Sequence, residues 1–173
     1  MTKKIALLVA SKGYQQDEYN ETYKVLIKAG VAVVTVSDKL GDAVAHDGST
    51  TRVDMTVEQV QPTQFDGLFL VGGRGAMRGK CLDTPAVYKV LNEFFALGKP
   101  YGAICVSPRI LAQAEVLRGK KATGWDDDGL VDQIFKDHDV TFVHDAVVVD
   151  GNVVTANGPQ AAHAFGQAIV SVL

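Results

Sequence analysis

The stretch YGAICVSPR, residues 101–109, is the part of this sequence that decides its fold class. Its first half is a short apolar run that predicts a buried strand ending at Cys105. Ser107 and Pro108 then predict the start of a helix, because serine is a good N-cap and proline fits the first helical position. A strand that turns into a helix at a cysteine indicates a nucleophile elbow, a strained turn that exposes the central side chain.

Small residues flank the cysteine two positions away on each side, Ala103 and Ser107, as in other elbows of this kind. The helix behind Cys105 would present the positive end of its dipole to the sulfur, which predicts a stabilised thiolate. The alternative is a structural cysteine packed at a strand end, since free cysteines are often buried. The local pattern leaves both interpretations open.

Apolar runs alternate with amphipathic stretches along the whole chain, which predicts an α/β fold with a parallel sheet covered on both faces. Residues 38–54 and 139–156 depart from this alternation and predict hairpins, and we expect residues 1–173 to form a single domain. The predicted strands are Ile5–Ala10, Val31–Val36, Gly67–Val71, Tyr101–Cys105 and Ala146–Val149. The predicted helices are Asp17–Ala29, Thr84–Leu97, Pro108–Leu117, Asp126–Phe135 and Gln160–Val172.

Composition excludes several classes of function. A net charge of −3 without a cluster of lysines and arginines predicts no nucleic-acid partner. Apolar runs stay well short of the roughly 20 residues that span a bilayer, so no membrane segment is expected. The two cysteines, Cys81 and Cys105, fit a reducing compartment better than a disulfide framework, which predicts a cytoplasmic protein.

Three features follow the ends of predicted strands, where ligands of such sheets bind. The first strand leads into residues 11–18, the strand Gly67–Val71 leads into a glycine-rich turn at residues 72–75, and a later strand ends at Cys105. The turn does not fit a phosphate loop, which would need glycine in place of Arg74 and Ser or Thr in place of Cys81. Its backbone amides could serve as an oxyanion hole, or the turn could bind nothing.

Glu18 is the candidate acid of this site. An acidic residue in the first turn of a helix commonly only complements the helix dipole. As a functional group, a carboxyl beside a thiolate would have a raised pKa through like charge and desolvation, and the two groups would share a proton. The four histidines lack metal-ligand spacing, so no metal site is expected, and Asp126–Asp128 predict a solvated helix start.

Taken together, these residues resemble the DJ-1/PfpI superfamily over essentially the whole chain. The resemblance implies a three-layer sandwich with a mostly parallel, flavodoxin-like sheet, related to the class I glutamine amidotransferases. It implies Cys105 as nucleophile, Glu18 as its carboxyl partner, and amides of Gly73 and Val106 at an oxyanion site, with Gly72 and Trp125 as further contacts to substrate. The matching stretches are Lys12–Glu18, Phe65–Arg74, Gly98–Pro100, Ala103–Cys105, Val116–Thr123 and Gly158–Pro159.

The sequence departs from the family pattern where histidines are usual. Val106 replaces the histidine that follows the cysteine in the protease-like branch, and Trp125 replaces a site histidine of another branch. A Cys-His-Glu peptidase triad is therefore disfavoured. Gln15 and Gln16 stand where relatives often have glutamates, which leaves Glu18 as the candidate acid.

The function that this resemblance implies is a glyoxalase without cofactor, acting on 2-oxoaldehydes such as methylglyoxal, with deglycase activity as a related possibility. That chemistry needs a thiolate and one carboxyl group. The alternatives are a cysteine peptidase, a hydratase-like enzyme, or a non-enzymatic stress protein in which Cys105 senses peroxide or the surface acts as a chaperone. The family also implies a homodimer or larger homo-oligomer, with a small carbonyl compound as the other partner.

Overall fold

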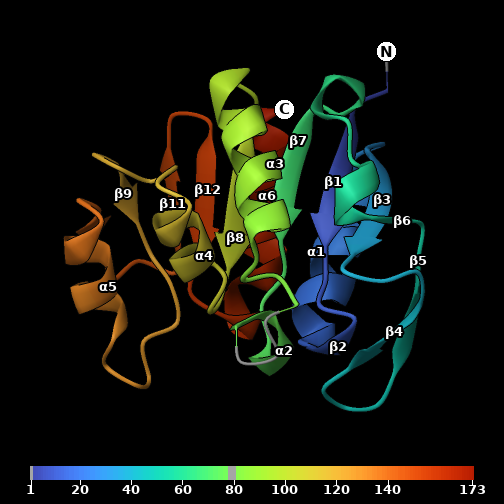
Figure 1. The fold of residues 1–173 in the computed structure, drawn as a ribbon, viewed down its shortest axis with the longest axis horizontal. Coiled ribbons are helices and arrows are strands. Elements are labelled where there is room, and N and C mark those ends of the chain that lie inside the picture. Colours follow the sequence, from blue (N-terminus) through green and yellow to red (C-terminus); the bar gives the residue numbers. More distant parts are fainter. Residues whose placement is uncertain (1, 78–80) are drawn as a thin grey trace.

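The computed structural model describes residues 2–77 and 81–173. Within these residues a seven-stranded sheet has the order β11–β12–β8–β7–β1–β3–β6 (Figure 1). All its neighbouring strands are parallel except β11 and β12, so the predicted mostly parallel sheet is confirmed. The strands span Lys4–Leu8 (β1), Ala32–Ser37 (β3), Met55–Thr56 (β6), Gly67–Leu70 (β7), Tyr101–Ile104 (β8), Val147–Asp150 (β11) and Val153–Ala156 (β12).

Helices cover both faces of this sheet, as the three-layer prediction requires. Helices α3 and α4 lie in front of the sheet in Figure 1, and α1 and α6 lie behind it. The helices span Gln16–Lys28 (α1), Arg74–Met77 (α2), Pro85–Ala96 (α3), Pro108–Gln113 (α4), Val131–Asp137 (α5) and Ala162–Val172 (α6). Short 3₁₀ turns occupy Val57–Gln59, Pro62–Gln64 and Pro159–Ala161.

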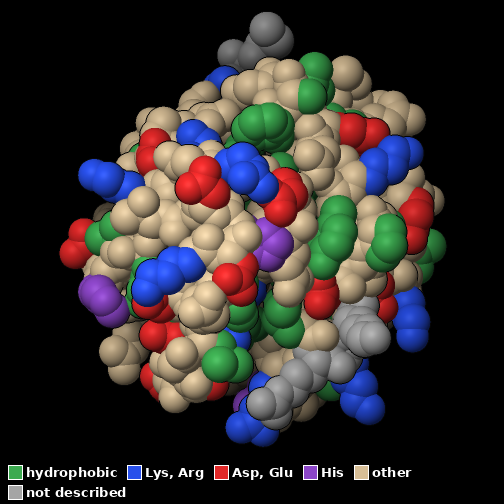
Figure 2. Space-filling view, turned by 60° about the vertical axis from the view of Figure 1, so that its left-hand side comes forward, with side chains coloured by type: hydrophobic (Ala, Val, Ile, Leu, Met, Phe, Trp, Pro, Cys, Tyr) green, Lys and Arg blue, Asp and Glu red, His purple; other side chains and the backbone are tan. Residues whose placement is uncertain are grey.

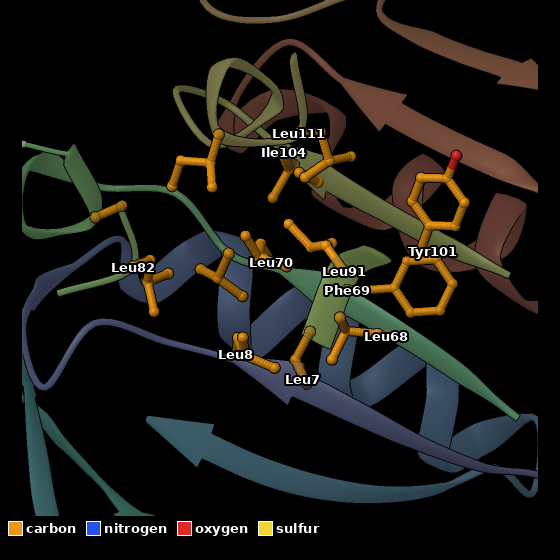
Figure 3. Close-up of a cluster of buried hydrophobic side chains, with 14 of the residues drawn as sticks. Leu7, Leu8, Leu68, Phe69, Leu70, Leu82, Leu91, Tyr101, Ile104 and Leu111 are labelled. Atoms are coloured by element: carbon orange, nitrogen blue, oxygen red, sulfur yellow. The ribbon is translucent and has the colours of Figure 1, made fainter. Parts of the chain in front are cut away.

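Buried aliphatic and aromatic side chains hold the layers together. Every residue of β7 and β8 is buried, and β1 is buried from Ile5 onward, because both faces of these central strands are covered. Leu91 of α3 and Leu111 of α4 point into the same cluster as Phe69 and Tyr101 (Figure 3). This core fixes the three strand ends from which the candidate site is built.

On the other face, α1 and α6 pack closely against each other. Gly166 of α6 makes this possible, since a β-carbon there would lie 2.9 Å from the β-carbon of Val25 in α1. The Thr22 hydroxyl of α1 also donates to the carbonyl of Ala162 (3.3 Å). The helix that carries Glu18 is thus held in place by α6.

Both predicted hairpins are present. Strands β4 (Gly41–Ala45) and β5 (Thr50–Val53) pair antiparallel, and β2 (Lys12–Tyr14) joins them in a small sheet. The second hairpin consists of β11 and β12, which turn at residues 150–152 as predicted. Outside it, β9 (Lys121–Ala122) and β10 (Thr141–Phe142) form a separate parallel pair.

Three local predictions are wrong. The helix expected over Pro108–Leu117 ends at Gln113, and the chain then reverses through Glu115 at φ 63°. The helix expected from Asp126 starts at Val131, because the Asp126 carboxylate accepts the Val131 amide (2.8 Å) and keeps the preceding residues in a turn. Ser107 does not cap α4 with its hydroxyl.

Instead, the hydroxyl of Ser107 donates to the carbonyl of Val71 (2.9 Å), which ties the start of α4 to the end of β7. Acidic and basic side chains are interspersed on the face shown in Figure 2. None of the helices in the described part of the chain has the length and apolar character of a membrane span.

Candidate active site

Cys105 occupies the turn between β8 and α4 in a strained backbone conformation. Its φ of 66° lies in the left-handed region, which residues with a β-carbon rarely adopt. Two backbone hydrogen bonds hold it there: its amide donates to the carbonyl of Ala156 (2.9 Å), and its carbonyl accepts the amide of Trp125 (2.8 Å). The side chain is 7% exposed, so the sulfur is largely enclosed.

Glu18 lies fully buried beside this cysteine, although it belongs to a distant part of the sequence. Gln15 accepts the amides of Asp17 and Glu18 through its side chain and so starts α1 in the right place (2.6 and 3.3 Å). One Glu18 carboxylate oxygen, Oε2, accepts the amide of Gly72 (2.8 Å). The other oxygen, Oε1, is buried and has no well-formed hydrogen bond with any residue that the structure describes.

Gly72 makes the close approach of these two side chains possible. A β-carbon at residue 72 would lie 2.5 Å from the Cys105 β-carbon and 2.8 Å from Oε2 of Glu18. The amide of Gly72 is occupied by Glu18, and its carbonyl accepts the amide of Gln15 (3.0 Å). Gly72 therefore positions the carboxyl group, which differs from the substrate contact expected for it.

Burial sets the acidity of this pair. It raises the pKa of Glu18 to about 7, although the Gly72 amide and the Cys105 side chain both act to lower it. Burial and the neighbouring Glu18 also raise the pKa of Cys105 well above that of an ordinary thiol. The predicted rise for Glu18 is confirmed, with desolvation as its main cause; the expected like-charge effect of Cys105 on Glu18 is wrong.

The prediction of a thiolate stabilised by the helix dipole is also wrong. Helix α4 has only six residues, and the cost of burying a charge outweighs its dipole. The backbone amides of Val106 and Gly73 bind the Cys105 sulfur and partly offset this cost. We infer that near neutral pH Cys105 and Glu18 hold one proton between them.

Gly73 also has a geometric reason to be glycine. Its φ is 113°, and a β-carbon there would lie 2.5 Å from the carbonyl oxygen of Gly13. This conformation turns the Gly73 amide toward the sulfur, opposite the amide of Val106 from the elbow. Two donors thus converge on the point where an oxygen bonded next to the sulfur would carry negative charge.

A cavity of about 530 Å³ opens in front of Cys105. Four of the predicted residues line it, namely Gly73, Cys105, Val106 and Trp125, whereas Glu18 and Gly72 lie outside its lining. Further lining residues come from elements that the sequence did not connect with the site: Gln15, His46, Arg74, Met77, Arg109, Asp128, Leu130 and Pro159.

The comparisons with known proteins give this arrangement a family. The DJ-1/PfpI family model matches residues 3–172. The chain belongs to the DJ-1/PfpI family. It is 34% identical over 167 residues to a deglycase of Pyrococcus abyssi, covering 96% of this chain and 98% of that protein. It is 32% identical over 167 residues to Deglycase PfpI of Pyrococcus furiosus, with the same coverage.

Solved structures of DJ-1/PfpI proteins agree with this assignment. A ThiJ/PfpI domain protein from Brachyspira murdochii superposes with a TM-score of 0.91 at 27% identity, covering 99% of this chain and 96% of that one. DJ-1beta of Drosophila melanogaster superposes with a TM-score of 0.86 at 26% identity, covering 99% and 90%. The predicted family and fold are confirmed.

Trp125, one of the departures from the DJ-1/PfpI pattern, is fixed over the cavity by Arg109. The Arg109 guanidinium is buried and donates to both carboxylate oxygens of Asp128 (2.6 and 2.9 Å). It also donates to the carbonyl of Trp125 (2.8 Å) and lies 5.7 Å from the centre of that ring. Asp128, expected at a solvated helix start, is therefore part of the cavity wall.

Sequence reasoning missed three members of this DJ-1/PfpI cavity. Arg109 directly follows the elbow, and a buried arginine in an otherwise apolar helix start was a signal for a partner. Asp128 gave no sign of being that partner, because 19 positions separate the two. His46 sits in the turn of the β4–β5 hairpin, and no local pattern could show that this hairpin reaches the site.

Proposed function

We propose that this protein is a cysteine-dependent glyoxalase that needs no cofactor and converts small 2-oxoaldehydes such as methylglyoxal into 2-hydroxy acids. The observation that carries the proposal is the buried pair of Cys105 and Glu18 at the base of a cavity, with two amides bound at the sulfur. Relatives named deglycases support an activity of the general deglycase and glyoxalase type.

In the first step the sulfur of Cys105 bonds to the aldehyde carbon, C1. Because the pKa of the thiol is raised, attack is coupled to removal of its proton by the Glu18 carboxylate. The electron pair of the C=O bond moves to the oxygen, where the amides of Gly73 and Val106 stabilise the negative charge. Glu18 returns the proton to this oxygen, which completes a hemithioacetal.

In the second step hydrogen moves from C1 to C2. Glu18, again a carboxylate, removes the proton of C1 and delivers it to C2, while the hydroxyl proton passes from the C1 oxygen to the C2 oxygen. C1 is oxidised to a thioester and C2 is reduced to an alcohol, so the step needs no external oxidant. A pKa of about 7 suits a group that must both take and give a proton near neutral pH.

In the third step water hydrolyses the thioester. The water oxygen bonds to C1, the C1–S bond breaks, and the sulfur leaves as the thiol or thiolate of Cys105. The product is a 2-hydroxy acid, and the sum of the three steps is the addition of one water to the 2-oxoaldehyde. Within this scheme Trp125 shields the intermediate from the side of the cavity mouth.

The test is lactate formation from methylglyoxal. We expect turnover by the wild-type protein and none by Cys105→Ala, with Cys81→Ala as the control that keeps wild-type turnover. Glu18→Gln should lower kcat by about two orders of magnitude, the usual scale of general acid–base catalysis. Lactate formation by Cys105→Ala at the wild-type rate would refute the proposed nucleophile.

We also propose that the protein works in the cytoplasm as a homo-oligomer. Cys81 and Cys105 are both free of disulfides, which supports a reducing compartment. Membership of the DJ-1/PfpI family supports self-association. Sedimentation of the purified protein tests the oligomer.

A further inference from the structure

The cavity in front of Cys105 presents hydrogen-bond donors that lack partners within the described part of the protein. Arg74, at the start of α2, lines the cavity, is exposed, and makes no ion pair or hydrogen bond with any described residue. Gln15 uses its Oε1 atom to start α1, and its Nε2 amide group has no bond to the described residues. Together with the amide of Gly73, these groups make a wall of donors.

The acceptors on the same walls are already engaged. Both carboxylate oxygens of Asp128 accept from Arg109, and one of them also accepts the amide of Leu130 (3.2 Å). The carbonyl of Trp125 accepts from Arg109 as well. Arg109 and Asp128 neutralise each other, so Arg74 is left as the uncompensated permanent charge of the lining, with Glu18 lying outside it.

The size of the cavity points the same way. A three-carbon substrate such as methylglyoxal would fill only a small part of about 530 Å³. A longer substrate that placed its carbonyl at Cys105 would extend its other end along the donor-lined wall. An anionic group at that end would complete the hydrogen bonds of Arg74 and Gln15, because guanidinium groups bind carboxylates and phosphates with two parallel donors.

We propose that Arg74 and Gln15 form an anion subsite, so that the preferred substrates are 2-oxoaldehydes with a carboxylate or phosphate a few bonds from the reacting carbonyl. This proposal rests on the proposed glyoxalase function for the identity of the reacting group. The subsite itself is a property of the cavity in front of the Cys105 sulfur, and it can be measured without turnover.

The first test compares alkylation of Cys105 by iodoacetate and by iodoacetamide. The two reagents share a leaving group and nearly the same size, and only iodoacetate is charged. We expect Arg74→Met to lower the rate ratio of iodoacetate to iodoacetamide by about fivefold, the effect of losing one partly exposed charged contact. Rates are followed by mass spectrometry of the Cys105 peptide at constant ionic strength.

Arg118→Met is the matched control for this test. Arg118 is exposed, pairs with Glu115 at 2.6 Å and does not line the cavity, yet its replacement changes the net charge equally. We expect it to keep the wild-type ratio. An unchanged ratio in Arg74→Met, or an equal fall in both variants, would overturn the anion subsite.

The second test uses turnover of two five-carbon substrates, 4,5-dioxopentanoate and the uncharged 2-oxopentanal. The wild-type protein should have the higher kcat/KM for the anion, and Arg74→Met should reduce this preference by about fivefold. A wild-type preference for the neutral aldehyde would overturn the subsite. If neither compound nor methylglyoxal is turned over, the proposed function fails while the alkylation ratio still decides on the subsite.

Discussion

The conformation of Cys105 is costly for any residue that has a β-carbon. A left-handed φ costs about 1–2 kcal/mol in such a residue, and the hydrogen bonds to Ala156 and Trp125 hold the chain there nonetheless. A strained backbone at a turn between strand and helix is typical of functional sites, where it aims one side chain into a cavity. The strain gives a prediction that separates the chemistry of Cys105 from its packing.

Cys105→Gly should be more stable than Cys105→Ala by about 1 kcal/mol, because glycine adopts this φ without a steric penalty. Part of the gain is lost to the greater freedom of glycine in the unfolded chain. Both variants lack the thiol and should be inactive. Urea unfolding measures the difference in free energy, and equal stability of the two variants would show that the elbow is unstrained.

Glu18 predicts an unusual dependence of stability on pH. Its pKa rises from an ordinary value of 4.5 to about 7, so the folded protein holds a proton that the unfolded chain releases at lower pH. The stabilisation that comes from this proton is complete below pH 4.5 and is lost as pH rises through 7. Its size is about 3 kcal/mol.

Glu18→Gln cannot titrate at this position and serves as the reference. The free energy of unfolding of the wild-type protein, relative to Glu18→Gln, should fall by about 3 kcal/mol between pH 4.5 and 7. Guanidinium unfolding at several pH values gives this difference directly. A difference that stays flat across this range would mean that Glu18 is ionised in the folded protein throughout.

At the scale of elements, the Arg109–Asp128 pair joins α4 to the loop that carries Trp125. Arg109→Met keeps much of the bulk of the side chain but leaves Asp128 and the carbonyl of Trp125 without their donors. Loss of one partner of a largely buried pair should lower stability by about 1–3 kcal/mol, since Asp128 remains partly exposed. Trp125 should then move away from the elbow.

Fluorescence reports this movement directly, because Trp125 is the single tryptophan of the chain. Arg109→Met should shift its emission to longer wavelength and increase its quenching by acrylamide. Arg118→Met again serves as the control and should leave the spectrum unchanged. An unaltered emission in Arg109→Met would show that Trp125 is held by contacts other than Arg109.

At the scale of the whole molecule, the site is assembled from the ends of three parallel strands. The loop after β1 leads to Glu18, the loop after β7 supplies Gly72 and Gly73, and β8 ends at Cys105. No two of these groups come from one local segment, so the site should exist only in the folded sheet. Alkylation of Cys105 at the rate of a free thiol should therefore appear at the same urea concentration as the loss of helix.

The sequence predicted the parts of this architecture that local patterns encode. Buried strands read as continuous apolar runs, and Gly30 and Gly98 at positive φ end α1 and α3 as expected. The fate of Ser107 was beyond local reasoning, because its hydroxyl has a choice between its own helix and the carbonyl of Val71. Only the packing of β7 beside β8 decides that choice.

The candidate site shows the same division. The elbow and the glycine turn are visible in the sequence, because strain and close approach leave glycine and small residues behind. The acidity of Cys105 was predicted with the wrong sign, since burial is a property of the assembled core and a short helix cannot offset it. The cavity walls from His46 and Asp128 depend on long-range placement that no spacing along the chain records.

The close packing of α6 on α1 has a consequence for protein synthesis. A nascent chain that has reached residue 156 already contains every strand of the sheet, yet α1 still lacks the helix against which Val25 and Gly166 meet. The helix that carries the acid thus docks only after residues 162–172 have emerged from the ribosome. Products of early termination would expose that face to chaperones and proteases, and the reactive thiol would gain its partner only in the finished protein.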